Sequence, residues 1–166
     1  YTTLFRSNPK WKEEFEKIVE SLGKEIIQNV IKIEHVGSTS VEGMSAKPII
    51  DLDIVIENDK FLILKKLLER KGYVHEGDLG IRDREAFSYI NKNDLMTHHL
   101  YVCPKDSEEL FKHITFRNYL SQHSELVDEY SKVKEKAAVL FPDNIDKYIE
   151  YKSGVIEKIY NQCGLL

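Results

Sequence analysis

The sequence predicts an α+β fold in which helices flank a mixed β-sheet and the C-terminal third is helical. Three observations lead to this prediction. β-branched, strand-like runs occupy residues 30–36 and 49–57. A polar turn separates two further strand-like runs, and only helical periodicity follows residue 106. Strands followed by a series of helices are typical of α+β proteins.

The N-terminal segment is predicted to be a helix that packs through one apolar face. Ser7-Asn8-Pro9 supplies a capping side chain before a proline, whose missing N–H costs nothing in a first helical turn. Apolar residues then recur at spacings of three and four, namely Trp11, Phe15, Ile18, Leu22 and Ile26. We expect Trp11 to be a core residue and not a platform for a ligand.

Five strand-like segments follow in the first two thirds of the chain. The runs at residues 30–36 and 49–57 are joined by a loop, and a short strand is expected at residues 73–75. The polar turn at residues 91–94 predicts an antiparallel hairpin between residues 84–90 and 96–103. The sheet is therefore expected to be mixed.

The remaining helices are predicted from apolar periodicity and from capping residues. An amphipathic helix at residues 58–71 ends at Gly72, where a left-handed residue is favoured. Asp106 and Glu109 resemble a capping box, which places a helix start at residue 106. Two more helices are expected on either side of Pro142, at residues 126–140 and 145–162.

Length and composition predict a single domain over residues 1–166. A chain of this size buries roughly 70% of its unfolded surface, and 42% apolar with 31% charged residues is ordinary for a globular protein. No apolar run approaches the length that spans a bilayer, and we expect a cytoplasmic protein. Cys103 and Cys163 lack the spacing of a zinc site, so free thiols are expected.

The net charge of −4 gives no strong case for nucleic acid as a partner, because nonspecific binding to a polyanion depends on Lys and Arg. A small nucleotide is compatible with this charge. One metal ion and a few local cations neutralise its phosphates, whatever the sign of the whole surface.

Two short motifs carry the candidate chemistry. In Asp51-Leu52-Asp53, strand alternation places both carboxylates on one face, with Ile50, Leu52 and Ile54 on the other. Paired carboxylates repel each other unless a cation neutralises them, and oxygen ligands favour Mg²⁺ or Mn²⁺. We therefore expect Asp51 and Asp53 to bind a divalent metal ion.

The second motif, His35-Val36-Gly37-Ser38-Thr39-Ser40, is a strand that enters a tight turn. Gly37 allows a close approach of the backbone to a ligand, and Ser38 and Thr39 at a helix start would donate to an anion. Either motif alone is better explained as an ordinary turn or as a solvated strand face. Together the two motifs predict a clamp for a metal ion and a triphosphate.

The same residues resemble a known family. The run from Glu34 to Val41, with Gly43 and the segment Ala46-Lys47-Pro48-Ile49-Ile50-Asp51-Leu52, resembles the signature of the GrpB-like family within the polymerase-β-type nucleotidyltransferase superfamily. The resemblance extends over nearly the whole chain, through Gly80, Arg84, Phe87, Thr97-His98-His99-Leu100, Phe116-Arg117, Tyr119-Leu120, Lys134, Tyr148 and Lys152. It implies a nucleotidyltransferase-type sheet and transfer of a nucleoside monophosphate to an acceptor.

One departure concerns a third carboxylate that transferases of this superfamily usually bring from a later strand. The comparable strand here reads Thr97-His98-His99-Leu100-Tyr101, without Asp or Glu. Alternation places His99 with Thr97 and Tyr101, and His98 with Leu100 on the opposite face. We therefore take His99 as the candidate base or metal ligand, although a lone histidine is more often structural.

The resemblance also supplies cations for the phosphates. A triphosphate needs positive charge beyond the metal ion, and the candidates, with the turn residues Gly37, Ser38, Thr39 and Ser40, are Lys47, Arg84, Arg117, Lys134 and Lys152. Lys47 and Arg117 are favoured because they lie in the resembling motifs. For Lys134 and Lys152, ordinary surface pairing is at least as good an interpretation.

Three hypotheses follow from these residues. The first is a metal-dependent nucleotidyltransferase that uses an NTP and an acceptor which the sequence does not identify. The second, suggested by the missing carboxylate, is a degenerate relative that binds a nucleotide or phosphorylated metabolite without turnover. The third is an interaction scaffold whose aspartates face solvent. The base preference and oligomeric state are not specified by the sequence.

Overall fold

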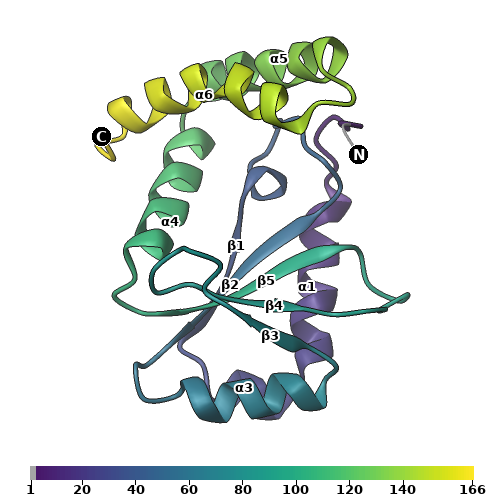
Figure 1. Ribbon diagram of the computed structural model, residues 1–166, viewed down its shortest axis with the longest axis vertical. Coiled ribbons are helices and arrows are strands. Elements are labelled where there is room, and N and C mark those ends of the chain that lie inside the picture. The colour runs from purple at the N-terminus through teal and green to yellow at the C-terminus, as the bar shows by residue number, and fades with distance from the viewer. Residues whose placement is uncertain (1–2) are drawn as a thin grey trace.

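Within residues 3–166, which the computed structural model describes, five strands form one mixed sheet (Figure 1). Their order across the sheet is β1-β2-β5-β4-β3. β2 and β5 pair in parallel, and every other neighbouring pair is antiparallel. The bounds are β1 Lys32–Val36, β2 Ile50–Ile56, β3 Val74–Gly77, β4 Glu85–Ser88 and β5 His98–Pro104.

The helices confirm the predicted α+β class, including the helical C-terminal third. Their bounds are α1 Lys10–Leu22, α2 Lys24–Gln28, α3 Phe61–Arg70, α4 Glu108–Ser121, α5 Ser124–Leu140 and α6 Ile145–Gln162, with a 3₁₀ turn η1 at Ser38–Ser40. In Figure 1, α5 and α6 form a layer at one end of the sheet, above the turn that follows β1. No helix within residues 3–166 is long and apolar enough to cross a membrane.

Strand alternation in β2 divides the core into two faces. Ile50, Leu52, Ile54 and Ile56 are at most 2% exposed and pack on one face with α1, α2 and α3. Burying an aliphatic side chain of this size contributes about 1.5–3 kcal/mol. On the opposite face, Val55 packs with apolar residues of β5 and α4, namely Cys103, Leu110 and Ile114. α4 therefore covers the face that carries the aspartates.

Two predicted local features differ in the structure. The apolar face that begins at Trp11 is buried through Ile26 as expected, but two helices supply it. Gly23 has φ 85°, a left-handed conformation that ends α1 and reorients the chain into α2. The cap of α4 is Ser107, whose hydroxyl accepts from the N–H of Leu110, and not the predicted Asp106.

Other predictions agree with the structure. Asn8 accepts from the N–H of Lys10 near the start of α1, and Gly72, with φ 91°, follows α3. β4 and β5 form the predicted antiparallel hairpin, although their pairing stops before residues 89–97. Trp11 is 4% exposed and belongs to the core, and both cysteines are free thiols.

Tyr73→Phe is expected to destabilise the fold by about 1–3 kcal/mol, because it leaves a buried imidazole nitrogen without a partner. Tyr73 is 2% exposed, and its hydroxyl lies 2.7 Å from Nε2 of His98, whose Nδ1 lies 2.8 Å from the carbonyl of Met96. Urea denaturation measures the loss. Tyr151→Phe, on the exposed part of α6, is the matched control; equal effects of the two substitutions would contradict the assignment.

Candidate functional site

The two aspartates of β2 lie on the face covered by α4, and each contacts a histidine. Asp51 Oδ1 is 2.9 Å from Nδ1 of His99, its neighbour across the parallel β2–β5 pair. Asp53 is 0% exposed, and its Oδ2 is 2.6 Å from Nδ1 of His113 on α4. An imidazole therefore lies against each of the two carboxylates that the sequence predicts to bind a cation.

His113 was missed by the sequence analysis, although the sequence contains a signal for it. Glu109, His113 and Arg117 recur every four residues, which places them on one stripe of α4. Two of them contact the sheet, since His113 reaches Asp53 and Arg117 contacts Glu34 of β1 at 2.6 Å, while Glu109 lies 3.2 Å from Nε2 of His113. A polar stripe beside the buried apolar residues of one helix indicates a polar partner surface.

The carboxylates favour protonation of both histidines. The hydrogen bond from His99 to Asp51 raises the pKa of His99. Burial alone would lower the pKa of His113, but the hydrogen bond and charge of Asp53, together with Glu109, outweigh burial and raise it. Each pair is thus an imidazolium–carboxylate pair over a wider pH range than a free histidine would allow.

Among the described residues 3–166, two buried side-chain polar atoms near Asp53 have no hydrogen-bond partner in the protein. These atoms are Asp53 Oδ1 and Arg84 Nε. Both residues adjoin Tyr101: Asp53 is its cross-strand neighbour, and the Arg84 guanidinium lies 4.3 Å from the centre of its ring. An unsatisfied buried carboxylate oxygen is costly. This face of the sheet therefore has capacity for a further polar or cationic partner.

The chemistry of this donor set fits Mg²⁺ that arrives with a nucleotide. Mg²⁺ commonly binds through one or two carboxylates, substrate phosphates and water, and not through an all-protein cage. Asp51 Oδ2 and Asp53 Oδ1 are the carboxylate oxygens that the histidines leave available. Accordingly, no group of three His, Cys, Asp or Glu side chains within residues 3–166 is arranged to hold a metal ion.

Gly37 is required by the close approach of Asp51. Its φ of 74° and ψ of −175° lie in a region that is essentially restricted to glycine. A Cβ at this position would overlap Asp51 Oδ2 and lie 3.1 Å from Cγ. Because Gly37 has no side chain, the Asp51 carboxylate can pack directly against the turn.

The turn after Gly37 differs from the expected helix start. Ser38–Ser40 forms one 3₁₀ turn and not an α-helix, so the expected array of helix N–H donors is absent from η1. The Ser38 hydroxyl instead accepts a short hydrogen bond from Nζ of Lys134, which also donates to the Ser45 carbonyl at 3.0 Å. α5 thus contacts the turn directly.

A cavity of about 240 Å³ brings together most of the predicted phosphate-binding residues. Ser38, Thr39, Asp51 and His99 contribute to one part of its lining. Lysines from the loop before β2, from α5 and from α6 complete the lining, namely Lys47, Lys134 and Lys152. Tyr148 lies among them. The centre of its ring is 5.4 Å from Lys47 Nζ and 5.0 Å from Lys152 Nζ. We call this space the lysine pocket.

The ammonium groups of Lys134 and Lys152 occupy electrostatically unfavourable positions in the lysine pocket. Lys134 is 3% exposed, and burial, with the charges of Lys152 and Lys47, lowers its pKa to about 7. Burial and Lys47 also lower the pKa of Lys152. A polyanion bound among these side chains would relieve both the repulsion and the desolvation cost.

Lys134→Met is expected to remove a pH dependence of stability. Because folding lowers the pKa of Lys134 from 10.5 to about 7, the unfolded chain binds more protons between these values. The cost of burying the ammonium is therefore complete below pH 7 and declines as pH rises toward 10. The free energy of unfolding of the unsubstituted protein should rise by up to about 1.4 kcal/mol per pH unit in this range.

Urea denaturation between pH 7 and 10 measures this slope. Lys136→Met removes an exposed lysine from the same helix and should retain the slope. A slope for Lys134→Met equal to that of the unsubstituted protein would show that Lys134 does not cause it.

Five predicted residues lie outside the lysine pocket lining, and one of them is Gly37, which packs against Asp51. Asp53 is buried beneath α4, where it contacts His113, and Arg84 lies over the ring of Tyr101. Ser40 and Arg117 line a different cavity, which α1 and α4 border. Arg117 was among the favoured phosphate ligands, but Glu34 and the carbonyl of His35 hold its Nη1 at the β1 edge.

Comparison with known sequences identifies the family. The sequence profile described as "GrpB protein" matches residues 2–162. The chain belongs to the GrpB family. It is 33% identical over 146 residues to the UPF0157 protein YqkA of Bacillus subtilis, covering 87% of this chain but 42% of YqkA. It is 29% identical to the glutamate-rich protein GrpB of Alkalihalophilus pseudofirmus, covering 96% of this chain and 94% of that protein.

Solved structures support the same family and extend the similarity of fold to a protein outside it. The crystal structure of the conserved protein GrpB from Enterococcus faecalis aligns with a TM-score of 0.82 at 34% identity, covering 97% of this chain and 96% of that one. Cid1 in complex with the UTP analogue UMPNPP aligns with a TM-score of 0.52 at 12% identity, over 77% of this chain and 43% of Cid1. The GrpB-family sheet thus shares the fold of a poly(U) polymerase.

Proposed function

We propose that this GrpB-family chain is a metal-dependent nucleotidyltransferase that transfers a nucleoside monophosphate from an NTP to an acceptor. The observation that carries the proposal is the lysine pocket, where Lys47, Lys134 and Lys152 lie opposite Asp51 and His99. The Cid1 structures with UMPNPP and with MgATP support a nucleotide as the ligand of such a fold.

The lysines are suited to the outer phosphates of the nucleotide. Burial, with the charges of Lys152 and Lys47, lowers the pKa of Lys134, and its Nζ donates to Ser38 in the turn. A bound triphosphate would replace this contact with charge-assisted hydrogen bonds, which are stronger than neutral ones. The pocket therefore binds the β- and γ-phosphates, with the α-phosphate directed toward Asp51.

Asp51 and Asp53 would hold the metal ion, through the carboxylate oxygens that the histidines leave available. When bound, Mg²⁺ or Mn²⁺ neutralises charge on the phosphates and orients them for in-line displacement. His113 positions Asp53, and Gly37 leaves the space that Asp51 needs.

His99 provides a proton acceptor beside the α-phosphate. Its Nδ1 is held by Asp51, while its Nε2 has no hydrogen bond within residues 3–166, and its side chain is 53% exposed. In the transfer step, an acceptor oxygen forms a bond to the α-phosphorus, and the bond from the α-phosphorus to the bridging oxygen breaks. Pyrophosphate leaves, and the acceptor proton passes to water or to the neutral form of His99, whose population grows only as pH rises because Asp51 raises the pKa of His99.

The test is a transfer assay with α-³²P-labelled NTPs, Mg²⁺ or Mn²⁺, and a cell extract as the source of acceptor. The expected result is a labelled product, with release of pyrophosphate, that requires both Asp51 and Asp53. Absence of any such product with each of the four NTPs and both metal ions would refute transfer.

The second candidate function is nucleotide or phosphometabolite binding without turnover. It is favoured by the full burial of Asp53 and by the absence of a third carboxylate on β5. It predicts that an NTP at a hundredfold excess over Kd stabilises the protein by about 3 kcal/mol, without chemistry. Thermal unfolding combined with the transfer assay distinguishes this candidate, since labelled product would exclude it.

A further inference from the structure

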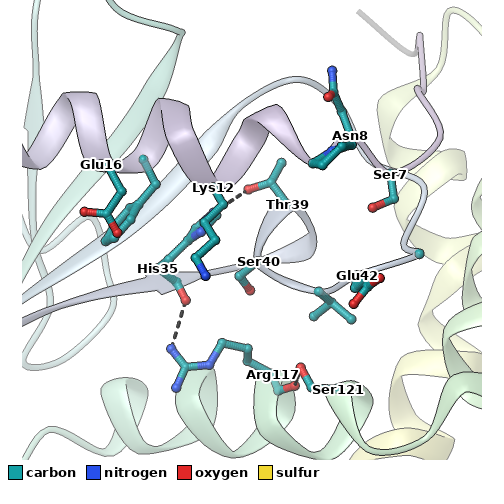
Figure 2. Close-up of a pocket in the computed structure, with 14 residues that line it drawn as sticks. Ser7, Asn8, Lys12, Glu16, His35, Thr39, Ser40, Glu42, Arg117 and Ser121 are labelled. Carbon is teal, nitrogen blue, oxygen red and sulfur yellow. Dashed lines mark hydrogen bonds between the residues drawn. The ribbon is translucent and has the colours of Figure 1, made fainter.

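A second and larger cavity, of about 900 Å³, lies on the other side of the Gly37–Ser40 turn. α1, the end of β1, the turn and α4 border it (Figure 2). We call it the α1–α4 cavity. None of Asp51, Asp53 and His99 lines it, and none of Lys47, Lys134 and Lys152 does. A ligand there would not contact the candidate reacting groups. We therefore consider a role for this cavity that is separate from the transfer reaction.

Two cations approach the α1–α4 cavity from opposite walls. Figure 2 shows Lys12 extending from α1 and Arg117 from α4 toward the same space, with Ser40 between them. Lys12 forms no ion pair with any residue in the range 3–166. These positions provide a point charge and a planar donor for one anionic group.

Hydrogen bonds within the protein already hold the Arg117 guanidinium in an orientation suited to binding an anionic group. Its Nη1 donates to Glu34 at 2.6 Å and to the His35 carbonyl at 2.9 Å, and its Nε donates to Asn118 at 3.1 Å. Its Nη2 has no hydrogen bond to the described part of the chain. Arg117 is 19% exposed, so little rotamer entropy is lost when an anion binds to it.

The cavity is connected to the Gly37–Ser40 turn by a short chain of contacts. Thr39 lines both this cavity and the lysine pocket. Its Oγ1 lies 2.9 Å from Nε2 of His35, whose ring stacks on Phe15 at 4.7 Å and whose carbonyl accepts from Arg117. The Ser40 hydroxyl donates to the carbonyl of Gly37. A ligand that contacts Arg117 and Ser40 therefore acts on both ends of the turn.

We propose that the α1–α4 cavity binds a small organic anion, carrying one phosphate or carboxylate group, that Lys12 and Arg117 recognise and that changes the conformation of the Gly37–Ser40 turn. The anion is an effector and not a substrate, because the turn separates it from Asp51. Glu16 and Glu42 at the borders of the cavity disfavour polyanions and favour ligands that also carry hydroxyl or amino groups.

The test is an NMR titration of the ¹⁵N-labelled protein, without nucleotide or metal, so that it is independent of the proposed transferase activity. Glycerol 3-phosphate is the phosphate probe and glycerate is the carboxylate probe. The expected result is saturable shifts of the Ser40 and Arg117 amides together with those of Gly37 and Ser38, with the probe of higher affinity identifying the anionic group.

Lys12→Glu should raise the Kd of that probe at least tenfold, because it reverses one of the two charges. Lys10→Glu makes the same charge change two residues earlier on α1, outside the cavity lining, and should change the Kd less than twofold. Three results would overturn the proposal: no saturable shifts with either probe, equal effects of the two substitutions, or shifts confined to residues around Lys134 and Lys152.

Discussion

Asp51→Asn and Asp53→Asn are each expected to lower nucleotidyl transfer by at least about a hundredfold. A metal ion contributes several kcal/mol to charge stabilisation in a phosphoryl transition state, and each 1.4 kcal/mol corresponds to a tenfold change in rate. Asparagine preserves the size of the side chain and an oxygen that accepts from His99 or His113. The substitution therefore removes the charge while keeping most of the contacts.

The measurement is the rate of pyrophosphate release at saturating NTP and Mg²⁺. Asp59→Asn, which neutralises an exposed aspartate just after β2, should retain full activity and serves as the control. Activity of Asp51→Asn and Asp53→Asn within a few-fold of the control would mean that the carboxylate pair does not hold the metal ion.

Gly37→Ala is expected to destabilise the protein and to abolish nucleotide binding. Alanine in this backbone region costs about 1–3 kcal/mol, and the added Cβ overlaps the Asp51 carboxylate. The carboxylate must then rotate away from the turn, which breaks its hydrogen bond to His99 and changes the lysine pocket. The substitution should therefore reduce the free energy of nucleotide binding by more than it reduces the free energy of unfolding.

Gly80→Ala is the control for Gly37→Ala, because it introduces backbone strain without a contact with Asp51. Gly80 has φ 85°, close to that of Gly37, but a Cβ there meets no atom within 4 Å. Its substitution should reduce stability alone, as measured by urea denaturation, and leave nucleotide affinity unchanged in calorimetry. If the two variants lose affinity equally, the close approach of Gly37 to Asp51 has no role in binding.

The sequence alone predicts the sheet because its signals are local. Apolar alternation in β2 identifies the strand and places Asp51 and Asp53 on one face, and the structure has this arrangement. Alternation on β5 likewise separates His98, which is buried against Tyr73, from His99, which contacts Asp51. These inferences need only the period of a strand.

Tertiary contacts account for what the sequence analysis missed. His113 reaches Asp53 from a helix 60 residues later, and no local pattern specifies which face of the sheet α4 covers. From the sequence, ordinary surface pairing is at least as good an interpretation of Lys134, because its burial depends on how α5 packs over the turn. Arg117 resembled a phosphate ligand by its motif, yet Glu34 on the edge strand sets its position.

The central claim is that the lysine pocket and the two aspartates together bind a metal–nucleotide complex. A crystal structure with Mn²⁺ and a nonhydrolysable NTP, with anomalous diffraction measured at the manganese edge, tests it most directly. We expect an anomalous peak at bonding distance from Asp51 and Asp53, with the outer phosphates against Ser38, Lys134 and Lys152. A nucleotide bound away from these lysines, or a manganese peak that contacts neither aspartate, would contradict the account.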